Sequence, residues 1–174
     1  PGVGGHCLAV DPYFIVEKAP SLACLIATAR EVNKQMPAYI VEQAKILLNR
    51  LEQPKIAALG LSYKGNVADL RESPAVKIVN LLDKEGFQVV VHDPLFDNNE
   101  NTTDMETAVK DADLILILTD HDIFKTYDYL KLVRHMRTPI IFDTRNIIDS
   151  ERFNDTEVVF YHLGNIFTAK ECSF

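Results

Sequence analysis

The sequence predicts an α/β protein in which a long connecting helix is followed by a doubly wound, Rossmann-like parallel sheet. From residue 55 onward, five short runs rich in valine and isoleucine alternate with segments of helical period. Such alternation of strands and helices indicates βαβ units and a parallel sheet. The runs are continuously apolar rather than alternating in polarity, which is typical of strands covered by helices on both faces.

The first 19 residues are rich in glycine and proline, and we expect residues 1–19 to form a loop around a candidate catalytic cysteine. In residues 20–53 apolar side chains recur every three or four positions, which predicts a helix from Ser21 to about Glu52. Pro37 should kink this helix or split it in two. A helix of about 30 residues extends roughly 45 Å, more than a small domain needs, so we expect it to brace two domains or two copies of the chain.

Residues 54–174 form the predicted sheet domain. Its five expected strands are Lys55–Leu61, Phe87–His92, Asp113–Thr119, Pro139–Asp143 and Glu157–Tyr161. The expected helices between them are Ser73–Lys84, Thr103–Asp111 and Ile123–Met136. In an open sheet of this kind, ligands bind beyond the carboxyl ends of the strands, near the point where the strand order reverses. The loop after the first strand is therefore a candidate binding segment.

Composition and charge exclude several classes of function. The net charge of -7 argues against a nucleic-acid partner or an anionic membrane surface. No apolar run approaches the ~20 residues that span a bilayer, and the N-terminal segment does not resemble a signal peptide. The three cysteines lie far apart and form no CxxC pair, which argues against a disulfide framework or a zinc site and favours the cytoplasm.

Asp120, His121 and Asp122 together resemble a metal cluster in composition. We expect His121 to cap the helix that follows it, and we assign no metal to the chain. The acidic stretch Asp97–Asp104 is expected to be a solvated loop.

Cys7 is the strongest candidate nucleophile. It follows Gly4 and Gly5, which allow the backbone to bend sharply and to approach a ligand closely. Asp11, four residues on, could position a water molecule or hold a proton beside the sulfur. The alternatives are an ordinary loop with a buried thiol and a simple Asp-Pro turn. His6 could serve as a base for Cys7, but adjacent side chains point apart, which favours a loop or substrate contact.

The loop at residues 60–74 is the strongest candidate for binding an anion. Lys64 and Arg71 flank the approach to a helix that begins at Ser73, so amide donors and the helix dipole would add to their charges. Each could instead be a solvated surface cation. Tyr63 could stack on a base or pack beneath the loop.

Two nucleotide-binding fingerprints fail in this chain. Gly60 and Gly65 have the glycine spacing of a P-loop, but asparagine and valine replace its lysine and its hydroxyl residue. Gly2 and Gly4 open a GxGxxG pattern, but Cys7 occupies the position of the third glycine. These 174 residues therefore contain neither fingerprint.

Four motifs resemble those of the UDP-glucose/GDP-mannose dehydrogenase family, in the same order: PGVGGHCLAVDPYF (residues 1–14), GLSYK (60–64), DLRESP (69–74) and FDTR (142–145). The resemblance covers nearly the whole chain. The stretch around the cysteine is similar to the form found in enzymes that act on UDP-N-acetylmannosamine. Enzymes that act on UDP-glucose more often carry a lysine where this chain has Val10.

The resemblance implies a four-electron oxidation of a sugar C6 alcohol to a carboxylate by two NAD⁺. Cys7 would attack the intermediate aldehyde, and oxidation of the thiohemiacetal would give a thioester that water hydrolyses. Asp11 matches the family aspartate that assists water activation and proton transfer. The alternatives are UDP-N-acetylglucosamine or UDP-glucose as the substrate, or a nucleotide-sugar binding and dimerisation module without chemistry of its own.

The resemblance also implies which residues bind these molecules. Those expected to contact the UDP-sugar come from three loops: Pro1, Gly2, Val3, Gly4, Gly5, Tyr63, Lys64 and Arg145. Those expected beside the NAD are Cys7, Val10 and Arg71. Arg145 could instead pair with Asp143 or Asp149 as a structural bridge.

The long helix would be the family's domain connector and dimer core, so we expect a homodimer. The family's amino-terminal NAD-binding domain is absent from these 174 residues, together with the lysine and asparagine that stabilise the developing oxyanion. We therefore expect the chain to be the carboxy-terminal part of a larger enzyme, with no dehydrogenase activity alone.

Overall fold

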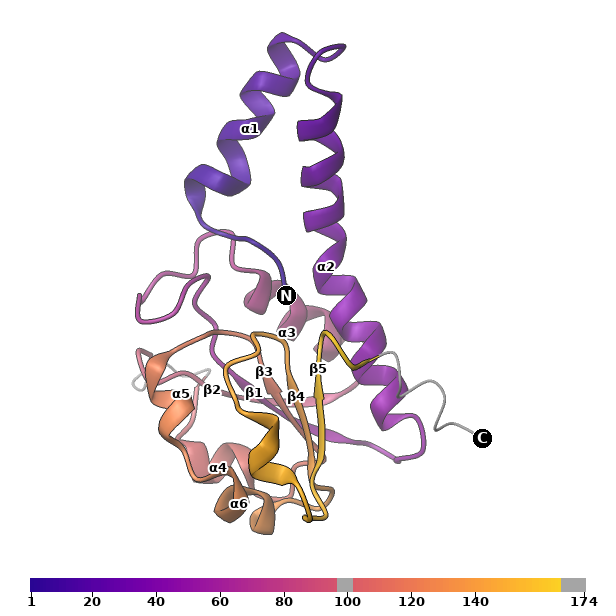
Figure 1. Cartoon of the computed structure of the whole chain (residues 1–174), viewed down its shortest axis with the longest axis vertical. Helices are drawn as coiled ribbons and strands as arrows, with labels where there is room; N and C mark the ends of the chain where they lie inside the picture. Colours follow the sequence, from indigo (N-terminus) through magenta and orange to yellow (C-terminus); the bar gives the residue numbers. More distant parts are fainter. Residues whose placement is uncertain (97–101, 167–174) are drawn as a thin grey trace.

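Five parallel strands form the centre of the structure, a computed structural model that describes residues 1–96 and 102–166 (Figure 1). The strands are β1 (Lys55–Leu59), β2 (Gln88–His92), β3 (Leu114–Ile117), β4 (Ile140–Asp143) and β5 (Val159–His162). They lie in the order β2-β1-β3-β4-β5, so the direction of winding reverses between β1 and β3. The predicted fold class is confirmed: a long helix precedes a doubly wound, Rossmann-like sheet.

Helices cover both faces of the sheet. One face is covered by α2 (Cys24–Leu48) and α3 (Pro74–Lys84), and the other by α4 (Met105–Val109), α5 (Asp122–Thr126) and α6 (Tyr129–Leu132). Alternate side chains of β1 serve the two cores: Ile56 and Ala58 on the first face, Ala57 and Leu59 on the second. All four are fully buried. The strands are continuously apolar because neither face meets water.

The five predicted strands all occur, whereas the third predicted helix differs. The expected helix Ile123–Met136 is divided into α5, α6 and a 3-10 turn at Val133–His135. The break lies at Tyr127, whose backbone is extended, and the Asp128 carboxylate then accepts the N–H of Lys131 at 3.2 Å. An aspartate whose carboxylate accepts the N–H three residues further on caps a new helix, which favours a new start over continuation of the preceding helix. A second 3-10 turn, at Ser150–Phe153, was not predicted.

Ser73 caps α3, as the sequence predicts. Its Oγ accepts the N–H of Ala75 at 3.2 Å and donates to the carbonyl oxygen of Leu61 at 2.6 Å. Pro74 fills the first helical position, where a backbone N–H has no intrahelical acceptor. Leu61 and Ser73 lie near opposite ends of the candidate anion-binding loop, residues 60–74. One hydroxyl group therefore holds the two ends of this loop together.

The expectation of a loop over residues 1–19 is wrong for most of that range, because His6–Lys18 forms the helix α1. Gly5, with φ 85°, directly precedes the helix. The glycine pair and Pro12 favoured a loop in the sequence, but no glycine recurs between Gly5 and Lys18. Tertiary packing against α2 supports α1, and the two helices form a hairpin that projects beyond the sheet (Figure 1).

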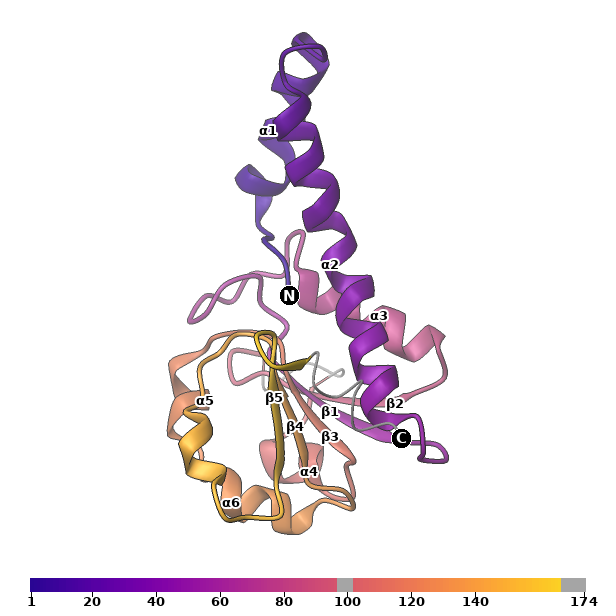
Figure 2. The same cartoon turned by 45° about the vertical axis from the view of Figure 1, so that its right-hand side comes forward.

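The helix α2 runs through Pro37 without being split. It begins three residues later and ends four residues earlier than the predicted range Ser21–Glu52. Only its C-terminal half packs on the sheet, through the buried residues Ile40, Val41, Ala44 and Leu48. The N-terminal half rises with α1 away from the sheet, as both views show (Figures 1 and 2).

Among residues 1–96 and 102–166, no helix combines the length and the apolar composition needed to cross a membrane. Most of the acidic stretch Asp97–Asp104 lies outside the described residues. Its last residue, Asp104, caps α4 by accepting the N–H of Thr107 at 2.9 Å.

Candidate active site

The candidate site lies at the carboxyl edge of the sheet, where the strand order reverses. Three loops leave the strands there: residues 60–73 after β1, 118–121 after β3 and 144–149 after β4. Residues 1–5 lie over this edge and lead into α1 (Figure 2). The N-terminal segment and the sheet loops, distant in sequence, therefore meet at the position where doubly wound proteins bind ligands.

Glycine is required in the N-terminal segment because the loop after β1 packs directly against it. A Cβ on Gly4 would lie 2.5 Å from the carbonyl oxygen of Glu72 and 2.7 Å from the Cδ of Pro74. Gly5 has φ 85°, and a Cβ there would lie 2.8 Å from the ring of Tyr63. In this structure Tyr63 packs against the N-terminal segment, a contact that the sequence analysis did not predict.

Two sets of backbone hydrogen bonds fix the same segment. The Gly5 N–H donates to the carbonyl oxygen of Arg71 at 3.2 Å. Asn33 of α2 holds Val3 from the other side: its Oδ1 accepts the Val3 N–H at 2.7 Å, and its Nδ2 donates to the Val3 carbonyl at 2.9 Å. Sequence reasoning did not select Asn33, because nothing in the helical period distinguishes it from other polar residues of α2.

Replacing Asn33 with alanine is expected to cost about 1–2 kcal/mol of stability, since its two hydrogen bonds to the Val3 backbone are lost. Gln35→Ala is the matched control, because the Gln35 side chain donates to Glu31 on the exposed face of α2. Thermal unfolding measures the loss. Equal stability of the two variants would show that the hydrogen bonds from Asn33 do not hold Val3 in place.

Cys7 and Asp11 lie one turn apart on the same exposed face of α1. Ala9 and Tyr13 lie on the opposite face, and the Tyr13 ring is 6.0 Å from the guanidinium of Arg30 on α2. The thiol and the carboxylate therefore point away from α2. Cys7 is in the first turn of the helix, where backbone N–H groups have no intrahelical acceptor.

Arg71 places a positive charge beside this face of α1. Its side chain is 70% exposed, and the guanidinium donates to Asp69 through Nε at 3.0 Å and Nη2 at 2.6 Å. These hydrogen bonds to Asp69 raise the pKa of Arg71 above its usual value, and Cys7 adds a smaller electrostatic contribution. Arg71 therefore lies next to the start of α1, where its carbonyl oxygen accepts the Gly5 N–H, and its exposed side chain is open to a negatively charged group that approaches from solvent.

Arg145 follows β4 and is held by Asp120, at 3.0 Å, rather than by either carboxylate considered from the sequence. The Asp143 carboxylate instead accepts three backbone N–H groups, from Arg145, Ile147 and Ile148. Burial acts to raise the pKa of Asp120, but the hydrogen bond and charge of Arg145, together with backbone N–H donors that include Gly65, lower it overall.

The remaining predicted site residues lie around these groups. Pro1 is buried. Lys64 is exposed and directly precedes Gly65 in the loop after β1. Val10 is half-buried on α1 beyond Cys7. The predicted residues of the N-terminal segment and of the loops after β1 and β4 thus lie at one edge of the sheet, and those of α1 lead away from it.

His121 occupies the N-cap position of α5, as predicted, but its side chain makes no capping hydrogen bond. Its Nδ1 accepts the N–H of Asn66 at 2.9 Å, and its Nε2 lies 3.3 Å from the Oδ2 of Asp93. The imidazole is buried and bonds the loop after β1 instead of the helix that follows it. Within residues 1–96 and 102–166, no cluster of three or more potential metal ligands is present.

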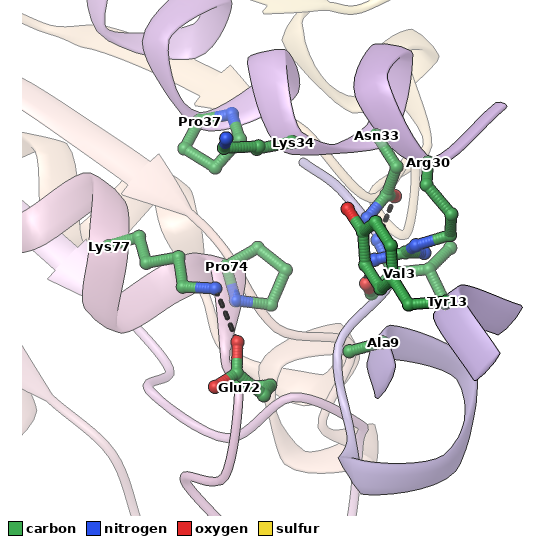
Figure 3. Close-up of a pocket in the computed structure, with 10 residues that line it drawn as sticks. All are labelled: Val3, Ala9, Tyr13, Arg30, Asn33, Lys34, Pro37, Glu72, Pro74 and Lys77. Carbon is green, nitrogen blue, oxygen red and sulfur yellow. Dashed lines mark hydrogen bonds and ion pairs between the residues drawn. The ribbon is translucent and has the colours of Figure 1, made fainter. Parts of the chain in front are cut away.

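A cavity of about 230 Å³ lies behind the N-terminal segment, between α1, α2 and α3 (Figure 3). Its lining includes Ala9 and Tyr13 from α1 and the ion pair of Lys77 with Glu72, whose atoms are 2.6 Å apart. Cys7 is on the other face of α1. The cavity therefore adjoins the residues that hold the glycine segment in place, and it does not adjoin the Cys7 thiol.

Fold and site together define a Rossmann-like domain of the class that holds anionic ligands where the strand order reverses, with an exposed cysteine presented beside it. The family model described as "UDP-glucose/GDP-mannose dehydrogenase family, UDP binding domain" matches residues 57–150. The chain belongs to the UDP-glucose/GDP-mannose dehydrogenase family.

Individual relatives within this family are also similar to the chain. The chain is 42% identical over 169 residues to a UDP-N-acetyl-D-mannosamine dehydrogenase of Methanocaldococcus jannaschii, covering 95% of this chain and 39% of the relative. It is 40% identical over 159 residues to an NDP-N-acetyl-D-galactosaminuronic acid dehydrogenase of Ralstonia nicotianae, covering 87% of this chain and 37% of that relative.

Among solved structures, the UDP-N-acetyl-mannosamine dehydrogenase Cap5O from S. aureus matches with a TM-score of 0.85 and 46% identity. The match covers 97% of this chain and 40% of that one. The chain therefore spans less than half the length of the relatives it matches.

Proposed function

We propose that this chain is the carboxy-terminal part of an NAD-dependent UDP-N-acetylmannosamine 6-dehydrogenase, which oxidises the sugar C6 alcohol to a carboxylate. The observation that carries the proposal is the placement of Cys7. It stands in the first turn of α1, directly after a glycine segment packed against the loop after β1, which carries Lys64 and Arg71. A thiol in this place can meet a substrate held by that loop.

Cys7 would act as the nucleophile toward the aldehyde formed in the first oxidation. Its sulfur would bond to C6, giving a thiohemiacetal, which the second oxidation converts to a thioester. The unpaired N–H groups in the first turn of α1 would donate to the oxygen on C6 as negative charge develops there. Asp11, one turn along the same face, would accept a proton from the water that hydrolyses the thioester.

NAD⁺, when bound, would accept the hydride in each of the two oxidations. The fit of this chain to such a cofactor rests on Arg71, whose side chain is 70% exposed and whose carbonyl oxygen accepts the N–H of Gly5, just before α1. A guanidinium in that position would suit the phosphates of a dinucleotide. Val10, on the same helix, would border this cofactor.

The UDP-sugar would lie over the carboxyl edge of the sheet. Backbone groups of residues 1–5 would contact it, because their glycines allow close approach. Lys64, on the loop after β1, and Arg145, on the loop after β4, would supply positive charge for the diphosphate. Tyr63, packed against Gly5, would keep the glycine segment in place against the substrate.

The test is a substrate panel with the full-length protein: UDP-N-acetylmannosamine, UDP-N-acetylglucosamine, UDP-glucose and UDP-N-acetylgalactosamine. We expect UDP-N-acetylmannosamine to give the highest kcat/KM and two NADH per uronate formed. The Ralstonia relative makes an N-acetylgalactosamine substrate the second candidate. NADH formation with none of the four would favour a binding module without chemistry. Residues 1–174 alone are expected to form no NADH, and turnover by them would contradict this division of the enzyme.

We further propose that the protein is a homodimer that pairs through α2. The N-terminal half of α2 projects beyond the sheet, and two leucines there are largely exposed: Leu25, in α2, is 78% exposed, and Leu22, in the turn just before α2, is 85% exposed. Apolar side chains so exposed on a projecting helix favour association. Sedimentation of the full-length protein at micromolar concentration is expected to give a dimer, and Leu25→Lys should weaken it. A monomer with these residues covered by another part of the same chain would contradict the proposal.

A further inference from the structure

The sequence Asp120-His121-Asp122, which follows β3, holds the turn at Gly65-Asn66 through each of its three residues. The Asp120 Oδ1 accepts the N–H of Gly65 at 3.1 Å, and the Nδ1 of His121 accepts the N–H of Asn66 at 2.9 Å. Asp122 exchanges two hydrogen bonds with the Asn66 side chain, at 2.7 Å and 3.0 Å. These three residues, which we call the lock, therefore hold the loops after β1 and β3 together at the point where the strand order reverses.

The backbones of Gly65 and Asp120 are in close contact. A Cβ on Gly65 would lie 2.3 Å from the carbonyl oxygen of Asp120, so the two backbones touch. Lys64 directly precedes this contact. Its backbone position is thereby fixed relative to Asp120, although its side chain is exposed.

His121 anchors the lock to the buried end of β2. Because its Nδ1 accepts a hydrogen bond, its ring proton resides on Nε2, which faces the Oδ2 of Asp93 at 3.3 Å. Asp93 is fully buried and also accepts the N–H of Leu61 at 2.7 Å. Both ring nitrogens of His121 have protein partners. The imidazole, which belongs to a stretch that resembles a metal cluster in composition, therefore holds the loops together.

Asp120 makes one contact that the other two residues of the lock do not. The same Oδ1 that accepts the Gly65 N–H lies 3.0 Å from the Nη2 of Arg145. The Arg145 side chain is 26% exposed and that of Asp120 36%, so the pair is screened from water only in part. One carboxylate oxygen therefore joins the loop that carries Lys64 to the strand end that carries Arg145.

We propose that Asp120 is a positioning residue that fixes the spacing between Arg145 and Lys64, so that the two cations form one site for the diphosphate of the nucleotide sugar. This inference rests on the proposed function. A guanidinium has five N–H donors, and the ion pair uses only part of them, which leaves the others for phosphate oxygens. Without the carboxylate, Arg145 gains rotamer freedom that must be lost again when the ligand binds.

The experiment compares Asp120→Asn with wild type in the full-length protein, using UDP as the probe in calorimetry and the nucleotide sugar in kinetics. Asparagine keeps the size of the side chain and an oxygen for the Gly65 N–H, but it removes the ion pair. We expect Kd for UDP and KM for the sugar nucleotide to rise about five- to tenfold, with kcat and KM for NAD⁺ changed less than twofold. Asp128→Asn is the matched control, because it removes the remote ion pair of Asp128 with Lys131.

A double-mutant cycle separates positioning from general support of the fold. If Asp120 acts through Arg145, Asp120→Asn should weaken UDP binding no further in an Arg145→Ala background. Additive losses in the cycle, or a lower kcat with unchanged KM, would overturn the inference. Wild-type protein that binds UDP as tightly as Asp120→Asn would also overturn it, leaving the proposed function intact. Wild-type protein that does not bind UDP at all would contradict the proposed function itself.

Discussion

Cys7→Ser in the full-length protein is expected to lower the rate of uronate formation by at least about a thousandfold. Serine keeps the size of the side chain and its place in the first turn of α1, but its hydroxyl is a far weaker nucleophile than a thiol without a strong base beside it. The sugar aldehyde would then have no covalent acceptor. Uronate quantified by mass spectrometry, together with NADH absorbance, measures the loss.

Cys24→Ser is the matched control for Cys7→Ser, since Cys24 is an exposed cysteine at the start of α2. It should keep full activity. Rapid quenching of the wild-type reaction should also show a mass adduct on the peptide that contains Cys7 and none on the peptide that contains Cys24. Undiminished uronate formation by Cys7→Ser would rule out the covalent route through this sulfur.

The sheet could be predicted from the sequence because its strands are buried on both faces. Residues such as Ile56 and Ala58 on one face, with Ala57 and Leu59 on the other, leave an apolar run that local pattern analysis detects directly. The α1 helix could not be predicted in this way. Its amphipathic pattern is weak, and the glycines before it and Pro12 within it predict a loop. The helix forms because it packs against α2, and that contact is not visible in the local sequence.

The candidate site divides in the same manner. Cys7, Lys64 and Arg71 stand in short motifs that sequence reasoning can single out. Their supports come from elsewhere in the chain: Asn33 holds Val3 from 30 residues away, and Asp120 joins loops that follow three different strands. These pairings depend on which strands are neighbours. A single sequence does not specify that order, so it could not show that Asp120, noted only as a neighbour of His121, is the partner of Arg145.

Gly4→Ala is expected to lower kcat/KM of the full-length protein about a hundredfold, because it must displace the segment that leads to Cys7. The added Cβ would lie 2.5 Å from the Glu72 carbonyl oxygen and 2.7 Å from the Pro74 Cδ. Both belong to relatively rigid groups at the start of α3, so the glycine segment is the part that moves. A shift of about 1 Å at a reacting group costs on the order of 10²-fold in rate.

Gly86→Ala provides the control that separates displacement from loss of stability. Gly86 has φ 89°, so alanine there is strained and should cost about 1 kcal/mol, but its Cβ would meet no atom within 4 Å. It lies between α3 and β2, at the opposite end of β2 from the carboxyl edge. Both variants should unfold at slightly lower temperature than wild type, and only Gly4→Ala should lose activity. Full activity in Gly4→Ala would show that the close packing of residues 1–5 on the loop after β1 does not determine where Cys7 meets its substrate.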